Sequence, residues 1–249
     1  MKVIKSLLLS CFLLTGSILS AQQTETRKIS AFNKIDAGTP FDVFTEEGNE
    51  ESVKLVLENI ALDNVITEVK DKILKVYLKK GNYKNIKGKV YITYKNLEAI
   101  NNSGSGNLIC NSDIKSGDFS IGLSGSGNAS TKKIKAKQFK VRKSGSGKVE
   151  VSDIETEIAE ISISGSGDLY IKNGYAKKEK INISGSGNVN ASGVQTDECA
   201  VSISGSGNVD VNVAKQLYGI ISGSGNIVYE GDAQVNSSNI AGSGRIRKR

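Results

Sequence analysis

The sequence contains no histidine and no tryptophan, and its 249 residues include one proline, three cysteines and one methionine. Without histidine, the protein cannot use histidine-ligated metal sites, histidine general bases or the usual serine triads. Aromatic residues make up only 6% of the chain, which argues against base stacking on single-stranded nucleic acid. We therefore expect no catalytic residues, no cofactor-binding residues and no metal ligands in this chain.

Long hydrophobic runs are also missing, apart from one at the start of the chain. Residues 1–21 begin with Lys2 and Lys5 and continue with a short apolar run. This pattern predicts a secretory signal peptide, cleaved after Ser20 or Ala21 and too short to span a membrane. Its removal lowers the formal net charge from +7 to +5, because two lysines are lost. We expect an exported protein with no transmembrane segment after signal removal, in the periplasm, at the outer-membrane surface or outside the cell.

The string Ser-Gly-Ser-Gly-Asn and its near copies dominate the rest of the chain. Successive copies are separated by 21, 20, 20, 20, 20, 18 and 19 residues. Self-similarity at a fixed period of about 20 residues is the signature of a solenoid, in which each unit stacks on its neighbours. The copies begin at Ser103, Ser124, Ser144, Ser164, Ser184, Ser204, Ser222 and Ala241.

The residues on either side of each copy alternate between apolar and polar. Ile181-Asn-Ile183 precedes one copy, for example, and Val189-Asn-Ala191 follows it. Alternation with β-branched residues predicts strands. Helical repeats need longer periods and fewer glycines, and leucine-rich repeats need regularly spaced leucine. We therefore predict an all-β fold, a single-stranded parallel β-helix (β-solenoid) with coils of about 20 residues.

The glycines of the motif share the parity of the flanking apolar residues. Continuous alternation would turn them inward, at a narrow place or corner that only glycine fits, and would turn the serines and the final asparagine outward as stacked ladders. The alternative is a glycine-rich turn that resets the phase.

Two columns of apolar residues support the register of about 20. The residues just before the motif are Leu123, Lys143, Ile163, Ile183, Ile203, Ile221 and Ile240, and those five residues after its first position are Leu108, Ala129, Val149, Leu169, Val189, Val209, Ile227 and Ile246. Asn102 and Lys143 interrupt the first column. For Lys143 we expect either a side chain that snorkels out or a slip in phase.

Charge also changes sign from one coil to the next. Residues 129–149 contain eight basic residues and no acid, and residues 149–167 contain five acids and no base. Such lateral pairs contribute roughly 0.2–1 kcal/mol each and oppose slips in register. Because these charges then have structural partners, we expect no nucleic acid to bind. The predicted stacks are Lys133 on Asp153, Lys135 on Glu155, Lys137 on Glu157, Lys140 on Glu160, Lys177 over Glu157, Lys180 over Glu160, and Asp197 after Lys177.

Cys110 and Cys199 are the cysteines left after signal removal. They lie more than four coils apart, which at about 4.8 Å per coil is on the order of 20 Å. That separation is too long for a disulfide, so both are expected to pack as small apolar residues.

Residues 29–100 lack the motif but also read as β-structure. Lys70-Asp71-Lys72 predicts a tight turn between two strands, and residues 59–64 predict one short helix. The candidate strands contain Phe41–Val43, Val53–Leu57, Val65–Val69, Leu74–Leu78 and Val90–Tyr94.

This N-terminal part, joined to the repeats, resembles a known family. The stretches that carry the resemblance are Ile35–Val43, Val53–Glu58, Val65–Val76 and Leu97–Ile100, followed by the first Ser-Gly-Ser-Gly-Asn. Together they are similar to the putative auto-transporter adhesin head domains, also called head GIN domains, over roughly residues 29–229. The resemblance implies an exported, right-handed parallel β-helix of envelope-associated bacterial proteins, with no catalytic residues attached. Since no translocating barrel follows the repeats, we do not expect a complete auto-transporter.

The residues leave two sites open to other interpretations. Parallel β-helices include polysaccharide lyases and hydrolases, and Glu155, Glu157 and Glu160 with Lys177 and Lys180 could serve such chemistry, although charge pairing explains them more economically. The basic segment 245–249 fits either contact with an acidic surface or protection of an exposed strand edge, which we favour. Repeat-bound calcium is disfavoured, because the final motif position is Asp in one copy only.

These observations give one organisation and one main function. We expect a signal peptide at 1–21 and a single β-solenoid domain at 22–249, with a β-rich part at 29–100 and eight motif-bearing coils at 101–249. We expect a non-catalytic, adhesin-like envelope or surface protein that binds a glycan or another cell-surface component. The alternatives are a carbohydrate-active enzyme on the same scaffold and a purely structural, self-associating envelope component. Sequence alone does not define the oligomeric state.

Overall fold

The computed structural model describes residues 22–249, apart from the side chains of residues 237 and 238. The predicted signal peptide lies outside the described residues. The repeat region begins with the strands β8 (Ala99–Asn102), β9 (Leu108–Cys110), β10 (Ile114–Leu123), β11 (Ala129–Lys143), β12 (Val149–Ile163), β13 (Leu169–Ile171) and β14 (Gly174–Gly185). It ends with β15 (Val189–Gly205), β16 (Val209–Gly223), β17 (Asn226–Glu230), β18 (Gln234–Gly242) and β19 (Arg245–Lys248).

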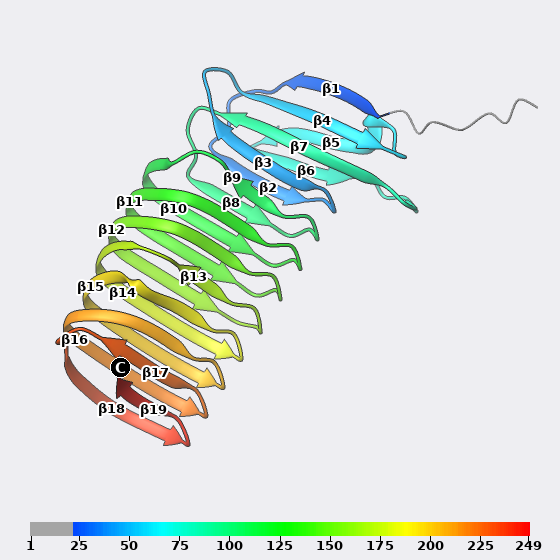
Figure 1. Ribbon diagram of the computed structural model, residues 1–249. Coiled ribbons are helices and arrows are strands. Elements are labelled where there is room, and N and C mark those ends of the chain that lie inside the picture. Colours follow the sequence, from blue (N-terminus) through cyan, green and yellow to red (C-terminus); the bar gives the residue numbers. More distant parts are fainter. Residues whose placement is uncertain (1–21) are drawn as a thin grey trace, which may run out of the picture.

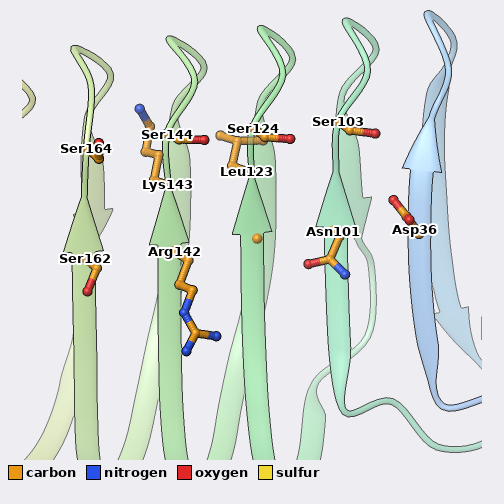
Figure 2. A pocket seen from close by; sticks show the side chains of 11 residues that line it. Asp36, Asn101, Ser103, Leu123, Ser124, Arg142, Lys143, Ser144, Ser162 and Ser164 are labelled. Atoms are coloured by element: carbon orange, nitrogen blue, oxygen red, sulfur yellow. The ribbon is translucent and has the colours of Figure 1, made fainter.

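The repeats form the predicted parallel β-helix, which Figure 1 shows as a stack of coils running from the N-terminal part toward the C-terminus. We call the strand segments that lead into the motif the front wall and those that follow it the back wall. In Figure 2 the front strands run upward, the chain turns over at the motif, and each later coil lies further to the left. This sense of winding makes the solenoid right-handed, as expected for parallel crossovers.

Both predicted columns are confirmed by the pairing register. On the front wall Leu123 pairs with Lys143, and the column continues through Ile163 and Ile183. On the back wall Ala129 lies between Leu108 and Val149. Coil-by-coil stacking buries these side chains in one continuous apolar cluster from Phe32 to Ile227, which stabilises coils that could not bury their inner faces alone.

The alternation predicted through the motif is confirmed in part, because its second glycine is buried and its serines are exposed, whereas its first glycine is only half-buried in most coils. The physical need for glycine differs from the one expected. A Cβ on Gly125 would lie 2.0 Å from the carbonyl oxygen of Gly104, and one on Gly145 would lie 2.0 Å from that of Gly125. Glycine is therefore required because the backbones of adjacent coils touch at the turn, rather than because the interior narrows there.

The turn has two backbone forms along the solenoid. In the later coils the first glycine has a positive φ, as at Gly185 (141°) and Gly205 (134°), and the incoming strand extends into the motif. None of the first glycines of the earlier coils has a positive φ. Ser144 and Gly145 instead donate their backbone N–H groups to Leu123 O. The earlier form ends the strand one residue before the first serine, and it lines the groove described below.

Residues 22–94 form β1 (Gln23–Lys28), β2 (Lys34–Gly38), β3 (Asp42–Glu47), β4 (Ser52–Glu58), β5 (Val65–Lys70), β6 (Ile73–Leu78) and β7 (Lys87–Tyr94). The pair β2–β3 makes a coil between β6–β7 and β8–β9. The antiparallel strands β1, β4 and β5 complete this end of the molecule. Arg27 links β1 to β5, because its guanidinium donates to Val65 O (2.7 Å) and to Thr67 Oγ1 (3.0 Å).

Two local predictions in this part meet different outcomes. The tight turn at residues 70–72 is confirmed, since Asp71 and Lys72 have φ values of 52° and 60° between β5 and β6. The short helix expected at residues 59–64 is reduced to one 3-10 turn, Leu62–Asn64. Asn59 has a φ of 62°, which ends β4 but does not begin a helix.

Candidate functional site

A groove of about 620 Å³ lies on the outer face of the front wall, beside the first turns of the solenoid. Figure 2 shows its side chains on neighbouring, parallel strands. Its rim is a row of motif serines, and its floor is the row of residues two positions before them. The lining residues are Asp36, Asn101, Ser103, Gly122, Leu123, Ser124, Arg142, Lys143, Ser144, Ser162 and Ser164.

The hollow exists because a glycine interrupts the outward row of the front wall. Register pairs Asn101 with Gly122, and Gly122 with Arg142. Gly122 has no side chain to fill the space, and a Cβ there would lie 2.2 Å from Asn101 Oδ1. The Asn101 amide therefore lies against the backbone of Gly122, and the floor between Asn101 and Arg142 stays open.

Arg142 contributes an exposed guanidinium to this groove. Lys140, two residues earlier on the same face, is bound to Glu160 at 2.6 Å. That contact chiefly lowers the pKa of Glu160, and Lys180 and Arg142 add smaller electrostatic effects. Arg142 itself makes no hydrogen bond or ion pair with any residue in the described part of the chain, so its five N–H donors are free for a ligand.

The serine row provides hydroxyl groups along the rim. Figure 2 shows the hydroxyls of Ser103, Ser124 and Ser144 pointing the same way from successive coils. The backbone N–H of Ser124 is bound to Asn102 O, and that of Ser144 to Leu123 O. Within residues 22–249 the hydroxyls of Ser124 and Ser144 have no hydrogen-bond partner. The backbone thus fixes the row while its hydroxyls can still donate and accept.

Lys143 lies under the turn. Both expectations for it are wrong, because its side chain does not extend into solvent and the register between coils does not shift at this residue. Its residue is 2% exposed, and its register with Leu123 and Ile163 is unbroken. The Nζ atom donates to Gly145 O at 2.8 Å. Burial lowers the pKa of the Lys143 ammonium, against an opposing effect of Asp168. Gly167 makes room for this amine, since a Cβ there would lie 2.0 Å from Nζ.

The asparagine ladder stacks as predicted but is committed to structure. Asn107 Oδ1 accepts from both the backbone N–H and the Nδ2 of Asn128, at 3.1 and 3.0 Å. The same pair of bonds links Asp168 to Asn188. An aspartate begins each run (Asp42 or Asp168), which suits a position that only has to accept. Lys148 separates the two runs, and these amides are not free for a ligand.

The charge pairs predicted between coils are confirmed in part. Lys133–Asp153 (3.3 Å), Lys135–Glu155 (2.5 Å) and Lys140–Glu160 (2.6 Å) form as expected. Positions 137, 157 and 177 keep the offset of 20 residues, but they lie between the paired positions 136 and 138 and their equivalents. None of the three residues forms an ion pair among those described, so the predicted charge pairs of Lys137 and Lys177 with Glu157 are wrong. Lys180 lies in register with Glu160, whose carboxylate instead binds Lys140.

Two of the acids considered for catalysis have lowered pKa values. The side-chain hydrogen bond from Lys135 lowers the pKa of Glu155, and that from Lys140 lowers the pKa of Glu160. A general acid of a glycosidase needs the opposite shift. In the described part of the chain, no group of three or more Cys, Asp or Glu side chains is placed to hold a metal ion.

Other expectations concern the cysteines and the basic C-terminal segment. Cys110 and Cys199 are buried and unbridged, as predicted. The segment forms the edge strand β19 and its continuation, where Arg249 pairs with Glu230 (2.5 Å) and Asp210 (3.4 Å).

No described helix has the length and apolar character required to cross a bilayer.

The groove depends on residues that the sequence reasoning did not single out. Asn101 and Gly122 were not selected, and Arg142 was counted only in the basic block. The available signal was a glycine at an outward position, flanked in adjacent coils by an amide and a guanidinium. This signal can be recognised only after the coils are aligned on the motif, which places Asn101, Gly122 and Arg142 side by side.

Comparison with known families now places the chain. The model of the putative auto-transporter adhesin, head GIN domain family matches residues 31–233. The chain belongs to this family. Membership is consistent with an exported protein, and it confirms the resemblance that the N-terminal strands and the repeats carried.

Solved structures of similar proteins support the same placement. A putative adhesin from Parabacteroides merdae is 25% identical, with a TM-score of 0.81 over 92% of this chain and 96% of its own. A protein from Parabacteroides distasonis, described as a putative lipid binding protein, is 27% identical, with the same TM-score and coverage. No curated protein matches the chain.

Proposed function

We propose that this head GIN domain protein is a non-catalytic, exported envelope or surface protein that binds a cell-surface glycan in the groove of the front wall. The observation that carries the proposal is a groove of about 620 Å³ lined by polar groups that form no hydrogen bond or ion pair among the described residues, the Arg142 guanidinium and the hydroxyls of Ser124 and Ser144. Sugars present many hydroxyls, and polar groups already fixed by the backbone bind them with little loss of conformational freedom.

The direction of the groove also supports an extended ligand. Its rim crosses successive coils at about 4.8 Å per step, so equivalent hydroxyls recur along the axis of the solenoid. A polymer lying along this axis would contact several coils at once. The family name and the description of the relative from Parabacteroides merdae as a putative adhesin agree with a binding role.

A screen of envelope polysaccharides, with binding and breakdown measured in the same wells, tests this function. We expect binding without breakdown. Ser124→Tyr, which fills the groove, should weaken binding at least tenfold. Ser204→Tyr, at the equivalent exposed position four coils away, should bind as the unaltered protein does. Release of reducing ends would overturn the non-catalytic assignment, and unchanged binding by Ser124→Tyr would place the ligand elsewhere.

A further inference from the structure

The groove continues past Arg142 into a second hollow of about 640 Å³ on the same wall. The two hollows share Asn101 and Arg142, so the guanidinium lies where they meet. In Figure 2 the Arg142 side chain runs down its strand, away from the turns. The second hollow is lined by earlier residues of the same strand, Gln138 and Lys140. A ligand in either hollow therefore lies beside this cation.

The groups around Arg142 favour a planar anion with hydroxyls beside it. A guanidinium presents two parallel N–H donors, which match the two oxygens of a carboxylate better than a single-point cation does. Ser124 and Ser144 offer free hydroxyls on the rim. The Asn101 amide lies across the open position above Gly122. A sugar ring that carries a carboxylate would use all three kinds of group.

Acidic side chains elsewhere in the two hollows limit how much negative charge the ligand can carry. Asp36 lines the first hollow three coils from Arg142, on the order of 14 Å away. Glu98 and Asp118 line the second hollow together with Lys34, and Lys140 there is occupied by Glu160. Dense charge along the ligand would meet these carboxylates. The surroundings therefore suit a polymer whose carboxylates are spaced apart by neutral sugars.

We propose, building on the glycan-binding function above, that Arg142 binds the carboxylate of a sugar acid in a polysaccharide that alternates acidic and neutral sugars. Asn101, Ser124 and Ser144 bind the hydroxyls of the same and the next ring. Arg142 is the determinant of specificity for acidic over neutral glycan.

The test compares a polysaccharide of alternating uronic acid and neutral sugar, such as hyaluronan, with the same polymer after its carboxyls are reduced to alcohols. We expect the protein to bind the acidic polymer at least tenfold more tightly. Arg142→Gln should remove this preference, so that the acidic and the reduced polymer bind equally. Arg142→Lys should restore only part of it, because an ammonium lacks the bidentate geometry. Arg247→Gln, on the exposed edge strand β19, makes the same change in charge outside the groove and should have no effect.

The outcomes separate this inference from the proposed function. Equal binding of both polymers, or an Arg142→Gln variant that keeps the preference, would overturn the carboxylate site while glycan binding stands. Failure to bind any polysaccharide would overturn both. Vesicles containing phosphatidylglycerol form a further arm, and binding to them without binding to the acidic polymer would replace the sugar carboxylate with a lipid phosphate. Circular dichroism of each variant confirms that it folds.

Discussion

At the scale of single residues, Glu179 is the polar group most at odds with its surroundings. It points into the core, where register places it between Ala159 and Cys199, and it is 2% exposed. Its Oε2 accepts from Thr196 Oγ1 at 3.3 Å, and its Oε1 has no partner among the described residues. Burial raises the pKa of Glu179 to about 7, and the bond from Thr196 opposes this rise. The thiol of Cys199 faces the same carboxyl group, and burial raises the pKa of that thiol.

This residue predicts a stability that falls as pH rises. The folded protein keeps Glu179 protonated up to about pH 7, whereas the unfolded chain releases the proton near the ordinary value of 4.5. The contribution of protonated Glu179 to the free energy of unfolding is complete below pH 4.5 and is lost between pH 4.5 and about pH 7. The loss amounts to about 3 kcal/mol. Urea unfolding at several pH values should show this loss. Glu179→Gln should remove most of it, and Glu157→Gln, at an exposed position, should not. A Glu179→Gln variant with an unchanged pH dependence would contradict the assignment.

At the scale of elements, the turns between the walls depend on contact between coils. The first glycine of the motif lies close to backbone carbonyl oxygens of the coil before, and a would-be Cβ would be 2.0 Å from the counterpart's carbonyl oxygen for both Gly125 and Gly145. A backbone atom cannot rotate away as a side chain can. The same serine and glycine string therefore recurs because each coil presents the same backbone surface to the next.

Two glycines joined to the same strand make a matched test of this account. Gly125→Ala would place Cβ against the carbonyl of Gly104, so we expect a loss of unfolding free energy of about 3 kcal/mol or more. Gly117→Ala, in β10, meets no atom within 4 Å and needs no positive φ. Its effect should stay within about 0.5 kcal/mol. Denaturant unfolding measures both. A small cost for Gly125→Ala would mean that the turn can open.

At the scale of the whole molecule, each coil is stabilised chiefly by its two neighbours. Strands in the middle of the solenoid pair on both sides, as β12 does with β11, β13 and β14. Strands β18 and β19 pair on one side only among the described residues, and Ile240 of β18 is 43% exposed. The stability of such an array is approximately the sum of the stabilities of its coils and of the interfaces between them. The coil that contains β18 and β19 has one described interface instead of two, so we expect it to be less stable.

Hydrogen exchange should therefore follow position along the axis. We expect backbone amides of β11 to β15 to exchange most slowly and those of β18 and β19 to exchange fastest. Strand β1 also pairs on one side only, but Arg27 ties it to β5, so its protection should exceed that of β19. Arg27→Ala should abolish the difference. Uniform protection along the whole solenoid would instead show that the chain opens as a single unit.

The sequence by itself determined the fold class, the coil length and the register. Period-two alternation and a repeat of about 20 residues are local and regular properties, and stacking adds no choice once each coil is fixed. The same regularity located the two apolar columns and the charge pairs at positions 133, 135 and 140. It did not show that residues 137, 157 and 177 form no ion pair among the described residues, because this depends on how each coil turns between its paired positions.

Only the tertiary structure decided which polar groups remain free. The asparagines and serines of the motif look equally available in the sequence, yet the ladder uses the amides in hydrogen bonds and leaves the hydroxyls of Ser124 and Ser144 without a partner among the described residues. Lys140 and Arg142 belong to one basic block, yet only Lys140 reaches a carboxylate. These outcomes depend on the distances between side chains of different coils. The distances decide whether a polar group forms a hydrogen bond within the protein or remains available to a ligand.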